Sequence, residues 1–322
     1  MKRTQFDVIV IGGGGAGLSG ALTLARARRS VLVLDGGQPR NLPATGVHGF
    51  LSRDGIAPAE LIKICREEVA GYGATIVDAL ATDIERVDDG FLVRTSQDSI
   101  HRARRLLLTT GLSDELPEIE GLRARWGRDV LHCPYCHGWE VRDQPIGVLN
   151  ISGHSAHQAL LLSQWSADVL FFRHTGPEPS GEETARLRAL GVSVIDGEVV
   201  GLEITDDELT GVRLADGRVV ARRAVAVAPP PAAHSELAEK LGAEKLGADT
   251  LGHPTGFGER LATDPTGRTS VPGLWAAGNV VDVTAQVVAS AAGGTTAAAM
   301  INADLIYEDA DRAILAERTL ER

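Results

Sequence analysis

A glycine-rich turn between a strand and a helix near the N-terminus constrains this chain more than any other feature. Residues 7–11 form a short run typical of a buried strand, Gly12–Gly17 (GGGGAG) follows at once, and residues 18–29 predict a helix. A second strand over residues 30–34 ends at Asp35. This order of strand, G-x-G-x-x-G turn, helix, strand and acidic residue indicates a dinucleotide-binding Rossmann unit.

Each residue type in this unit has a physical role. Gly12 makes the tight turn, Gly14 lets the backbone approach a pyrophosphate, and Gly17 lets the helix pack close to the strand. The helix N-terminus offers free N–H groups and a positive dipole end to phosphates. Asp35 is the expected acceptor for a ribose hydroxyl. The whole context favours dinucleotide binding over a purely structural turn.

A second unit of the same kind follows 139 residues later, where residues 146–149 and 170–172 align with the two strands. Its turn is altered, because Ile151 stands in the position of the first glycine and His174, preceded by Arg173, in the position of the acid. Isoleucine resists positive φ and fills space near a pyrophosphate. A basic pair could at best meet a 2′-phosphate. The open interpretations are a modified nucleotide site and a fold that has lost its ligand.

Two of the three cysteines lie in the segment Leu131-His132-Cys133-Pro134-Tyr135-Cys136-His137-Gly138-Trp139-Glu140. Thiols separated by two residues can close a small disulfide ring, and in a chain without signs of secretion such a pair indicates redox activity or metal binding. The third, Cys65, lies on the apolar face of a helix expected over residues 57–72 and is predicted to be a small buried residue.

The remaining segments predict further strands and a small-residue helix. Residues 75–77, 83–87 and 91–95 resemble a β-meander that leads into a buried strand at residues 105–109. Later strands are expected at residues 192–195, 199–205, 210–214 and 219–227, and a helix at residues 235–240. The small residues 289–299 begin a helix that is expected to end near Tyr307 and to approach backbone closely.

Composition limits the class of protein. A length of 322 residues suits about two domains, and 43% hydrophobic with 23% charged residues indicates an ordinary globular protein. The net charge of −11 argues against nucleic-acid binding. No apolar run approaches the ~18 residues of a membrane span, and the N-terminus lacks a signal-peptide pattern. We therefore expect a cytoplasmic protein without nucleic-acid or membrane partners.

Three blocks stand in one order: the first glycine turn with Asp35, the Cys133–Cys136 pair before a second Rossmann unit, and Pro272–Asn279 before the small-residue helix. This arrangement resembles the low-molecular-weight thioredoxin reductase family of FAD-dependent oxidoreductases over nearly the whole chain. The resemblance implies an α/β homodimer in which each chain has two Rossmann-like three-layer domains, the second inserted in the first. The implied domains are an FAD-binding domain at 1–112 and 246–322 and a nicotinamide-type domain with the C-x-x-C motif at 113–245.

The resemblance also assigns cofactor contacts. The FAD pyrophosphate turn and the ribose acceptor would be Gly12, Gly14, Gly15, Gly17 and Asp35. The loop along the FAD would contribute Gln38, Arg40, Asn41 and His48, and the adenine side and domain crossover would contribute Ile84, Thr109 and Gly111. The ribityl and flavin-ring contacts would be Gly278, Asn279, Gln286 and Val287. Asn279 replaces the family's aspartate, so this position can still form hydrogen bonds but is uncharged.

In the family, the second cysteine faces the flavin and the first exchanges with substrate, which assigns these roles to Cys136 and Cys133. Two departures from thioredoxin reductases proper stand out. His137 follows Cys136 where an aspartate is usual, and His132 precedes Cys133; a nearby imidazole can take a thiol proton and stabilise a thiolate. The expected His-Arg-Arg of the nicotinamide site is Arg173-His174-Thr175. Both departures resemble the dithiol-oxidase branch, which closes disulfides in gliotoxin- and holomycin-type natural products.

By that resemblance, a small-molecule dithiol reduces the cysteine pair, FAD receives the two electrons, and molecular oxygen reoxidises the flavin, so that NADPH is doubtful. One alternative is a reductase driven by NADPH or ferredoxin and acting on a thioredoxin-like protein; another is a non-catalytic redox-sensing flavoprotein. The C-x-x-C-H pattern of c-type haem attachment leaves the FAD blocks unexplained. A zinc site with His154 and His157 misses the usual ligand spacing, so no metal is expected.

Overall fold

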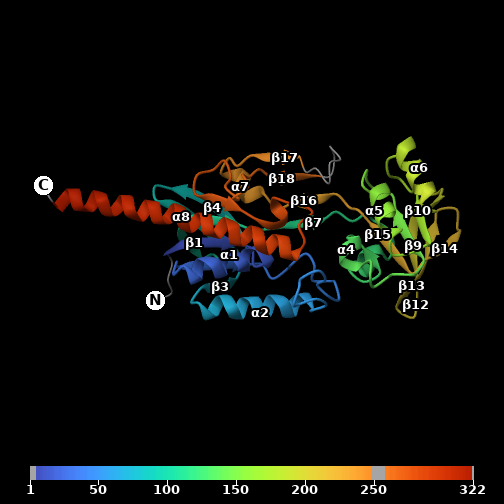
Figure 1. Ribbon diagram of the computed structural model, residues 1–322, viewed down its shortest axis with the longest axis horizontal. Coiled ribbons are helices and arrows are strands. Elements are labelled where there is room, and N and C mark those ends of the chain that lie inside the picture. The colour runs from blue at the N-terminus through green and yellow to red at the C-terminus, as the bar shows by residue number, and fades with distance from the viewer. Residues whose placement is uncertain (1–4, 248–257, 321–322) are drawn as a thin grey trace.

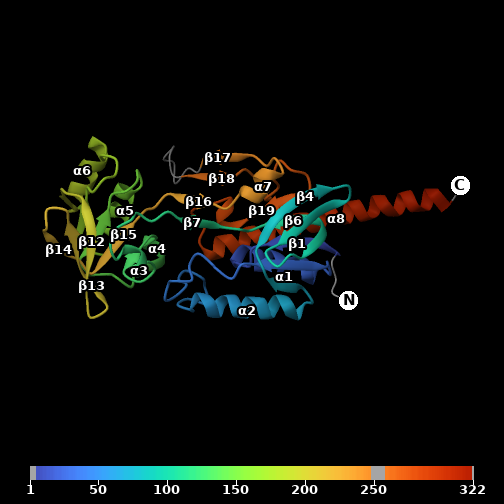
Figure 2. The same ribbon diagram turned by 180° about the vertical axis from the view of Figure 1, so that it is seen from behind.

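The structure is a computed structural model that describes residues 5–247 and 258–320. It contains a mixed β-sheet and a parallel β-sheet, each inside its own three-layer domain, and a small sheet that links them (Figures 1 and 2). The linking sheet has the order β17-β18-β16-β7 and consists of β7 (Leu112–Asp114), β16 (Pro231–Ala233), β17 (Lys245–Gly247) and β18 (Glu259–Leu261). The predicted α/β class with two Rossmann-like domains is confirmed.

The first sheet has the strand order β3-β2-β1-β6-β5-β4, and β19 pairs with β6. Its strands are β1 (Gln5–Ile11), β2 (Val31–Asp35), β3 (Thr75–Asp78), β4 (Ala81–Val87), β5 (Gly90–Thr95), β6 (Ile100–Leu108) and β19 (Leu274–Ala276). The pairs β1–β2, β1–β6, β2–β3 and β6–β19 are parallel. Because β19 follows all strands of the second sheet in sequence, the second domain is inserted in the first, as predicted.

Helices cover one face of the parallel strands of this sheet, and its antiparallel β4–β5 hairpin, which pairs with β6, packs over their other face. The helical face carries α1 (Gly15–Arg26), α2 (Pro58–Gly71) and α8 (Val287–Leu320). The β4–β5 hairpin and α7 (Glu236–Lys240) pack against the opposite face. Helix α8 approaches α1 so closely that a Cβ on Gly294 would lie 1.9 Å from the carbonyl oxygen of Ala16. The predicted close approach of the small-residue helix to backbone is therefore confirmed.

The second sheet is parallel throughout, with the order β11-β10-β9-β15-β8. Its strands are β8 (Val130–Leu131), β9 (Ile146–Leu149), β10 (Val169–Phe172), β11 (Ser193–Ile195) and β15 (Ala224–Val227). Helices α5 (Ser155–Leu162) and α6 (Gly181–Ala189) pack on one face. The antiparallel sheet of β12 (Val199–Thr205), β13 (Glu208–Leu214) and β14 (Val219–Ala221) covers the other. Both domains thus repeat one architecture.

Three predicted elements differ from the structure. The strand at residues 75–77 lies at the edge of the first sheet, parallel to β2, and not in the meander. The strand predicted over residues 219–227 is split, because buried Arg222 turns inward and pairs with Asp168 at 2.7 Å. The last helix continues past Tyr307 to Leu320, since residues 308–320 contain neither glycine nor proline.

The boundaries of the predicted domains at residues 112 and 246 stay predictions, because both fall in the linking sheet, which is separate from the main sheet of either domain. Two helical turns and one short helix complete the described chain: α3 (Leu122–Arg125), α4 (Pro134–His137) and the 3-10 helix η1 (Gly278–Val280). Among residues 5–247 and 258–320, no helix has both the length and the apolar character needed to cross a bilayer.

Candidate functional site

A cavity of about 1040 Å³ extends from the glycine turn after β1 to the Cys133–Cys136 disulfide. Most predicted cofactor residues line it: Gly12, Gly14, Gly15, Asp35, Gln38, Arg40, Asn41, His48, Thr109, Gly111, Gly278, Asn279, Gln286 and Val287. The four predicted catalytic residues line the same cavity: His132, Cys133, Cys136 and His137. The structure therefore brings the predicted cofactor and catalytic residues together, although they come from both domains.

Two predicted cofactor residues do not line the cavity. Gly17 lies beneath the turn, where a Cβ would approach the Gly12 carbonyl oxygen to 1.9 Å. This contact agrees with its predicted role in helix packing. The Ile84 side chain is 2% exposed and lies in the core of the first domain. The predicted backbone contact of Ile84 with the adenine side stays a prediction.

The first glycine turn has the shape that a pyrophosphate needs. Gly12 has φ = 110°, and a Cβ there would lie 2.3 Å from the Thr109 carbonyl oxygen, so a larger residue would be strained and obstructed. A Cβ on Gly14 would meet nothing within 4 Å. Helix α1 begins here without a side-chain cap or an acidic residue in its first turn. Its N–H groups are thus available for phosphate oxygens, and these residues fit FAD.

Asp35 is held at the rim of this turn. Its carboxylate accepts the Gly37 N–H at 3.0 Å and an Arg66 N–H at 2.7 Å. A Cβ on Gly13 would lie 2.3 Å from the Asp35 carboxyl carbon, which requires glycine there as well. Arg66 also lines the cavity, and no sequence pattern predicts it, because its pairing with Asp35 depends on how α2 packs beside β2.

Cys65, one residue before Arg66, is half-buried, packs beside the core under α1 and α8, and lines the cavity. Burial raises the pKa of its thiol. An apolar packing role was predicted and fits these contacts, although the residue is less buried than expected.

The redox cysteines are positioned by the short helix α4. Cys133 precedes the helix, Pro134 occupies its first turn, and the N–H groups of Cys136 and His137 donate to the Cys133 carbonyl at 3.1 and 3.2 Å. Proline suits this position because its fixed φ is already helical. The amide nitrogen of Gln286 lies 4.0 Å from Cys136 Sγ. Cys136 is thus the sulfur in contact with a residue predicted at the flavin ring.

His132 is held in one protonation state by Arg40. The guanidinium lies 3.3 Å from His132 Nδ1, and because arginine only donates, Nδ1 accepts and the ring proton resides on Nε2. Burial and the Arg40 charge lower the pKa of His132 to about 4. Asp114 fixes Arg40 through two hydrogen bonds of 2.6 and 2.7 Å. His132 is therefore neutral at neutral pH.

His137 lies beside a second set of charged groups. Burial lowers the pKa of His137, and the nearby Glu140 carboxylate opposes that effect. Glu140 Oε1 lies 3.4 Å from His48 Nε2, and Asp54 Oδ2 lies 3.4 Å from His48 Nδ1. His48 comes from the predicted cofactor loop, so this loop contacts the redox segment directly.

Tyr135 and Trp139 project from the redox segment into solvent, with 63% and 65% of their surfaces exposed. Tyr135 meets Trp165 edge-on at 5.8 Å, and the Arg142 guanidinium lies over Trp139 at 4.2 Å. Both aromatic residues therefore flank the disulfide without packing into a core.

The second glycine-type turn is closed by its own side chains. Ile151 packs against the core between the parallel and antiparallel sheets of the inserted domain. The N–H groups of Ile151 and Ser152 donate to the hydroxyl of fully buried Ser155 at 3.2 and 3.3 Å. In a nucleotide site, amides of such a turn are directed at the pyrophosphate. Here the two amides donate to the Ser155 hydroxyl oxygen and not to a phosphate oxygen.

The basic residues after β10 are also engaged within the protein. His174 Nδ1 accepts the Val199 N–H at 3.0 Å. The Arg173 guanidinium pairs with Asp196 at 3.0 Å and with Glu178 at 3.4 Å. Gly176 N–H donates to the Asn150 carbonyl at 3.0 Å, so this segment lies across the end of β9.

Residues 6–294 match the family model of the pyridine nucleotide-disulphide oxidoreductases. The chain belongs to this family. The crystal structure of HlmI is 47% identical, covers 98% of each chain and has a TM-score of 0.91. An oxidoreductase from Agrobacterium tumefaciens is 36% identical, covers 94% of this chain and 99% of its own, and has a TM-score of 0.85.

Curated relatives match over shorter stretches. Thioredoxin reductase tcpT of Claviceps purpurea is 34% identical over 49% of this chain and 53% of its own length. Thioredoxin reductase aclD of Aspergillus oryzae is 35% identical over 47% of this chain and 49% of its own length. The chain thus spans about half the length of the curated relatives that it matches. The predicted resemblance to thioredoxin reductase-like enzymes and the prediction of an oxidoreductase are confirmed.

Proposed function

We propose that this chain is an FAD-dependent dithiol oxidase that closes an intramolecular disulfide in a small-molecule dithiol, with molecular oxygen as terminal acceptor. The observation that carries the proposal is the contrast between the two turns. The first turn is open and shares one cavity with the cysteine pair, whereas the amides of the second donate to Ser155. This contrast favours a dithiol over NADPH as the electron donor.

The first turn, Asp35, the cofactor loop and the segment from Gly278 to Val287 would hold FAD. When bound, FAD supplies a two-electron acceptor that is reduced by the cysteine pair and reoxidised by oxygen, which becomes hydrogen peroxide. The chain's own residues perform the thiol exchange that precedes this transfer.

In the first exchange, a substrate thiolate attacks Cys133 Sγ, the Cys133–Cys136 bond breaks, and Cys136 leaves as a thiolate. The second substrate thiolate then attacks the substrate sulfur of the mixed disulfide and releases Cys133. The substrate thereby loses two protons and two electrons, and its two sulfurs are joined; the cysteine pair carries the two electrons. Exchange requires thiolates, so a base must take the thiol protons.

His137 is the better candidate for this base. It directly follows Cys136, and because burial lowers its pKa, it is neutral at neutral pH and able to accept a proton. His132 is also neutral, but its Nδ1 already accepts from Arg40, which suits a positioning role.

Anaerobic flavin absorbance tests the proposal. Addition of a small dithiol to the FAD-loaded protein should bleach the flavin, NADPH should not, and colour should return in air with formation of hydrogen peroxide. Cys136→Ser should abolish bleaching by the dithiol, whereas the control Cys65→Ser should retain it. Rapid bleaching by NADPH, with turnover of a thioredoxin, would contradict the proposal and establish a reductase.

A further inference from the structure

Gln286 of the first domain contacts the disulfide of the inserted domain. Its amide nitrogen Nε2 lies 4.0 Å from Cys136 Sγ, at the outer limit of a hydrogen bond to sulfur. The family resemblance assigns Gln286 a contact with the flavin ring, and the contact with the sulfur is additional to that role. Because an amide nitrogen only donates, it interacts most strongly with Cys136 when this cysteine is a thiolate.

The backbone and the side chain of Gln286 are both held in place. Gln286 directly precedes α8, and its carbonyl accepts the Ser290 N–H at 2.9 Å, which ties it to the first turn of a 34-residue helix. Its Oε1 lies beside Gly49 of the predicted cofactor loop, where a Cβ would be 3.6 Å away. A donor that is held in this way needs no rearrangement when negative charge develops on the sulfur.

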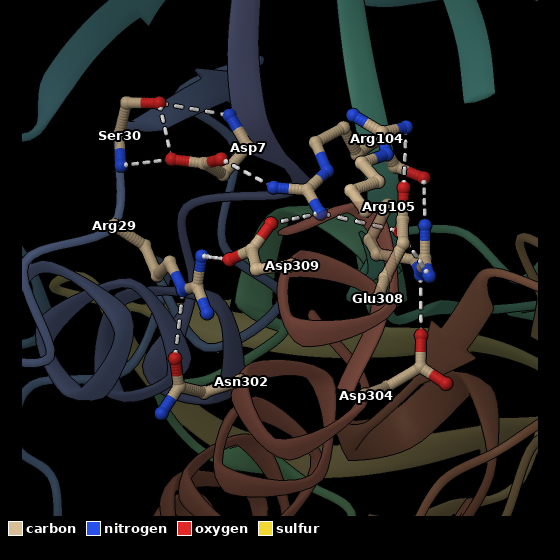
Figure 3. Close-up of polar contacts among 10 residues, drawn as sticks. Asp7, Arg29, Ser30, Arg104, Arg105, Asn302, Asp304, Glu308 and Asp309 are labelled. Atoms are coloured by element: carbon tan, nitrogen blue, oxygen red, sulfur yellow. Dashed lines mark hydrogen bonds and ion pairs between the residues drawn. The ribbon is translucent and has the colours of Figure 1, made fainter. Parts of the chain in front are cut away.

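The two arginines that line the cavity are already engaged by carboxylates. Arg40 donates to Asp114 at 2.6 and 2.7 Å, and Arg66 donates to Asp35 at 2.7 Å. Figure 3 shows another group of arginines, on β6 and just before β2, which pair with carboxylates of α8 and line no part of this cavity. The guanidinium groups of the cavity are thus neutralised, and the donor in contact with Cys136 is a neutral amide.

We propose that Gln286 is a catalytic hydrogen-bond donor that stabilises the Cys136 thiolate when the disulfide opens, and that it thereby selects Cys133 as the sulfur that the substrate attacks. The inference rests on the proposed function for the order of the steps. As the substrate thiolate bonds to Cys133 Sγ, the Cys133–Cys136 bond breaks and its electron pair stays on Cys136. Gln286 transfers no proton in this step.

The selection follows from the chemistry of exchange. Thiol–disulfide exchange is faster when the leaving sulfur is the more stable thiolate. A donor beside Cys136 therefore favours attack at Cys133 over attack at Cys136. The roles that the family resemblance assigns to the two cysteines thereby acquire a cause in a side chain of this protein.

The ionisation of Cys136 tests the hydrogen bond. In the FAD-loaded Cys65→Ser, Cys133→Ser protein, Cys136 is the remaining cysteine, and its rate of alkylation by iodoacetamide against pH follows the thiolate fraction. Gln286→Met, which cannot donate, should move the midpoint to higher pH and slow alkylation at neutral pH about threefold to tenfold. Gln286→Glu should move the midpoint further, because a carboxylate repels a thiolate.

Gln164→Glu, at an exposed glutamine of the inserted domain, is the matched control and should leave the midpoint unchanged. Circular dichroism and flavin absorbance verify that each variant is folded and holds FAD. A midpoint that stays in place in both Gln286 variants would overturn the proposal.

Peptide mapping tests the choice of sulfur. The oxidised, FAD-loaded Cys65→Ser protein is mixed anaerobically with 2-mercaptoethanol and quenched with acid, and the adduct is located by tandem mass spectrometry. The adduct should lie on Cys133, and Gln286→Met should raise the share on Cys136 severalfold. An adduct confined to Cys133 in both proteins would overturn the selection of the attacked sulfur. Neither test involves oxygen or NADPH, so a failure here and a failure of the oxidase proposal are distinguishable.

Discussion

His48 Nε2 lies 3.4 Å from Glu140 Oε1, so a side chain of the predicted cofactor loop contacts a carboxylate three residues after His137, the proposed base. Asp54 approaches the other ring nitrogen of His48 at the same distance. The cofactor loop and the redox segment are therefore electrostatically coupled, and a change at Glu140 should be felt at His137.

Glu140→Gln should move the acid limb of the pH–rate profile for dithiol turnover to lower pH. The Glu140 charge raises the pKa of His137, so removal of the charge lowers that pKa and keeps the imidazole neutral in more acidic solution. The measurement is initial rate against pH, with Glu118→Gln as an exposed control. An unchanged acid limb would show that His137 is not the group that limits the rate at low pH.

Asn279→Asp should lower the stability of the protein, although aspartate is the residue usual in the family at this position. Asn279 Nδ2 donates to the carbonyls of Asp282 and Ala285 at 3.0 and 2.9 Å, and a carboxylate cannot donate to either. We expect a loss of about 1–3 kcal/mol in urea unfolding, with faster release of FAD. Asn302→Asp is the control, since Asn302 Oδ1 accepts from Arg29 and a carboxylate preserves that contact.

His132 should make the protein less stable in acid. Its folded-state pKa of about 4 lies below its ordinary value of 6.5, so protonation favours the unfolded chain. Its contribution is complete above pH 6.5 and is lost as pH falls from there to about 4. The loss should be roughly 1–3 kcal/mol. His132→Asn keeps an acceptor near Arg40 but does not titrate, so the slope of unfolding free energy against pH should flatten over this range.

Ser155→Ala should destabilise the inserted domain without creating a nucleotide site. The change leaves the N–H groups of Ile151 and Ser152 without their acceptor, at a cost of roughly 1–3 kcal/mol. Urea unfolding measures this loss, and Ser163→Ala, at a half-buried serine that donates to Leu160, is the control. If Ser155→Ala left the stability unchanged, the Ser155 hydroxyl would not be the acceptor that the N–H groups of the turn require.

Two adjacent glycines of α8 offer a matched pair. Gly294→Ala should destabilise the first domain by about 1–3 kcal/mol and reduce FAD retention, because the new Cβ would meet the Ala16 carbonyl at the start of α1. Gly293→Ala should gain up to about 1 kcal/mol of helix stability, since its nearest contact would be an ordinary 3.8 Å to Ala277. Thermal unfolding compares the two, and equal shifts would contradict the close α1–α8 contact.

The local features of the fold were predictable because each rests on neighbours in sequence. The geometry of the glycine turn with Asp35 is set by residues within that motif, and so is the geometry of the cysteine pair around Pro134. Ile151 departs from the pattern, and its packing against the core of the inserted domain explains why isoleucine occupies that position. These cases need only the strand–turn–helix pattern.

Features that depend on distant packing were not predictable in the same way. Arg66 meets Asp35 only because α2 lies beside β2, and Arg40 meets His132 only because the two domains share one cavity. The split at Arg222 follows from a buried pairing with Asp168, which leaves no periodic trace in the sequence. Helix α8 is longer than predicted because the prediction rested on the small-residue pattern, which ends before residues 308–320, although these contain neither glycine nor proline to end the helix.

The hydroxyl of Ser155 has a consequence for the lifetime of the protein. A ligand that binds only the folded state stabilises it by RT ln(1 + [L]/Kd), so a domain with an open nucleotide site becomes less stable when that nucleotide is scarce. When the amides of a turn donate to a residue of the same chain, that stabilisation does not depend on the concentration of any ligand. In the proposed oxidase, resistance of the inserted domain to unfolding and proteolysis should then stay constant when the nicotinamide concentration falls, and only the stability of the first domain should depend on the flavin concentration.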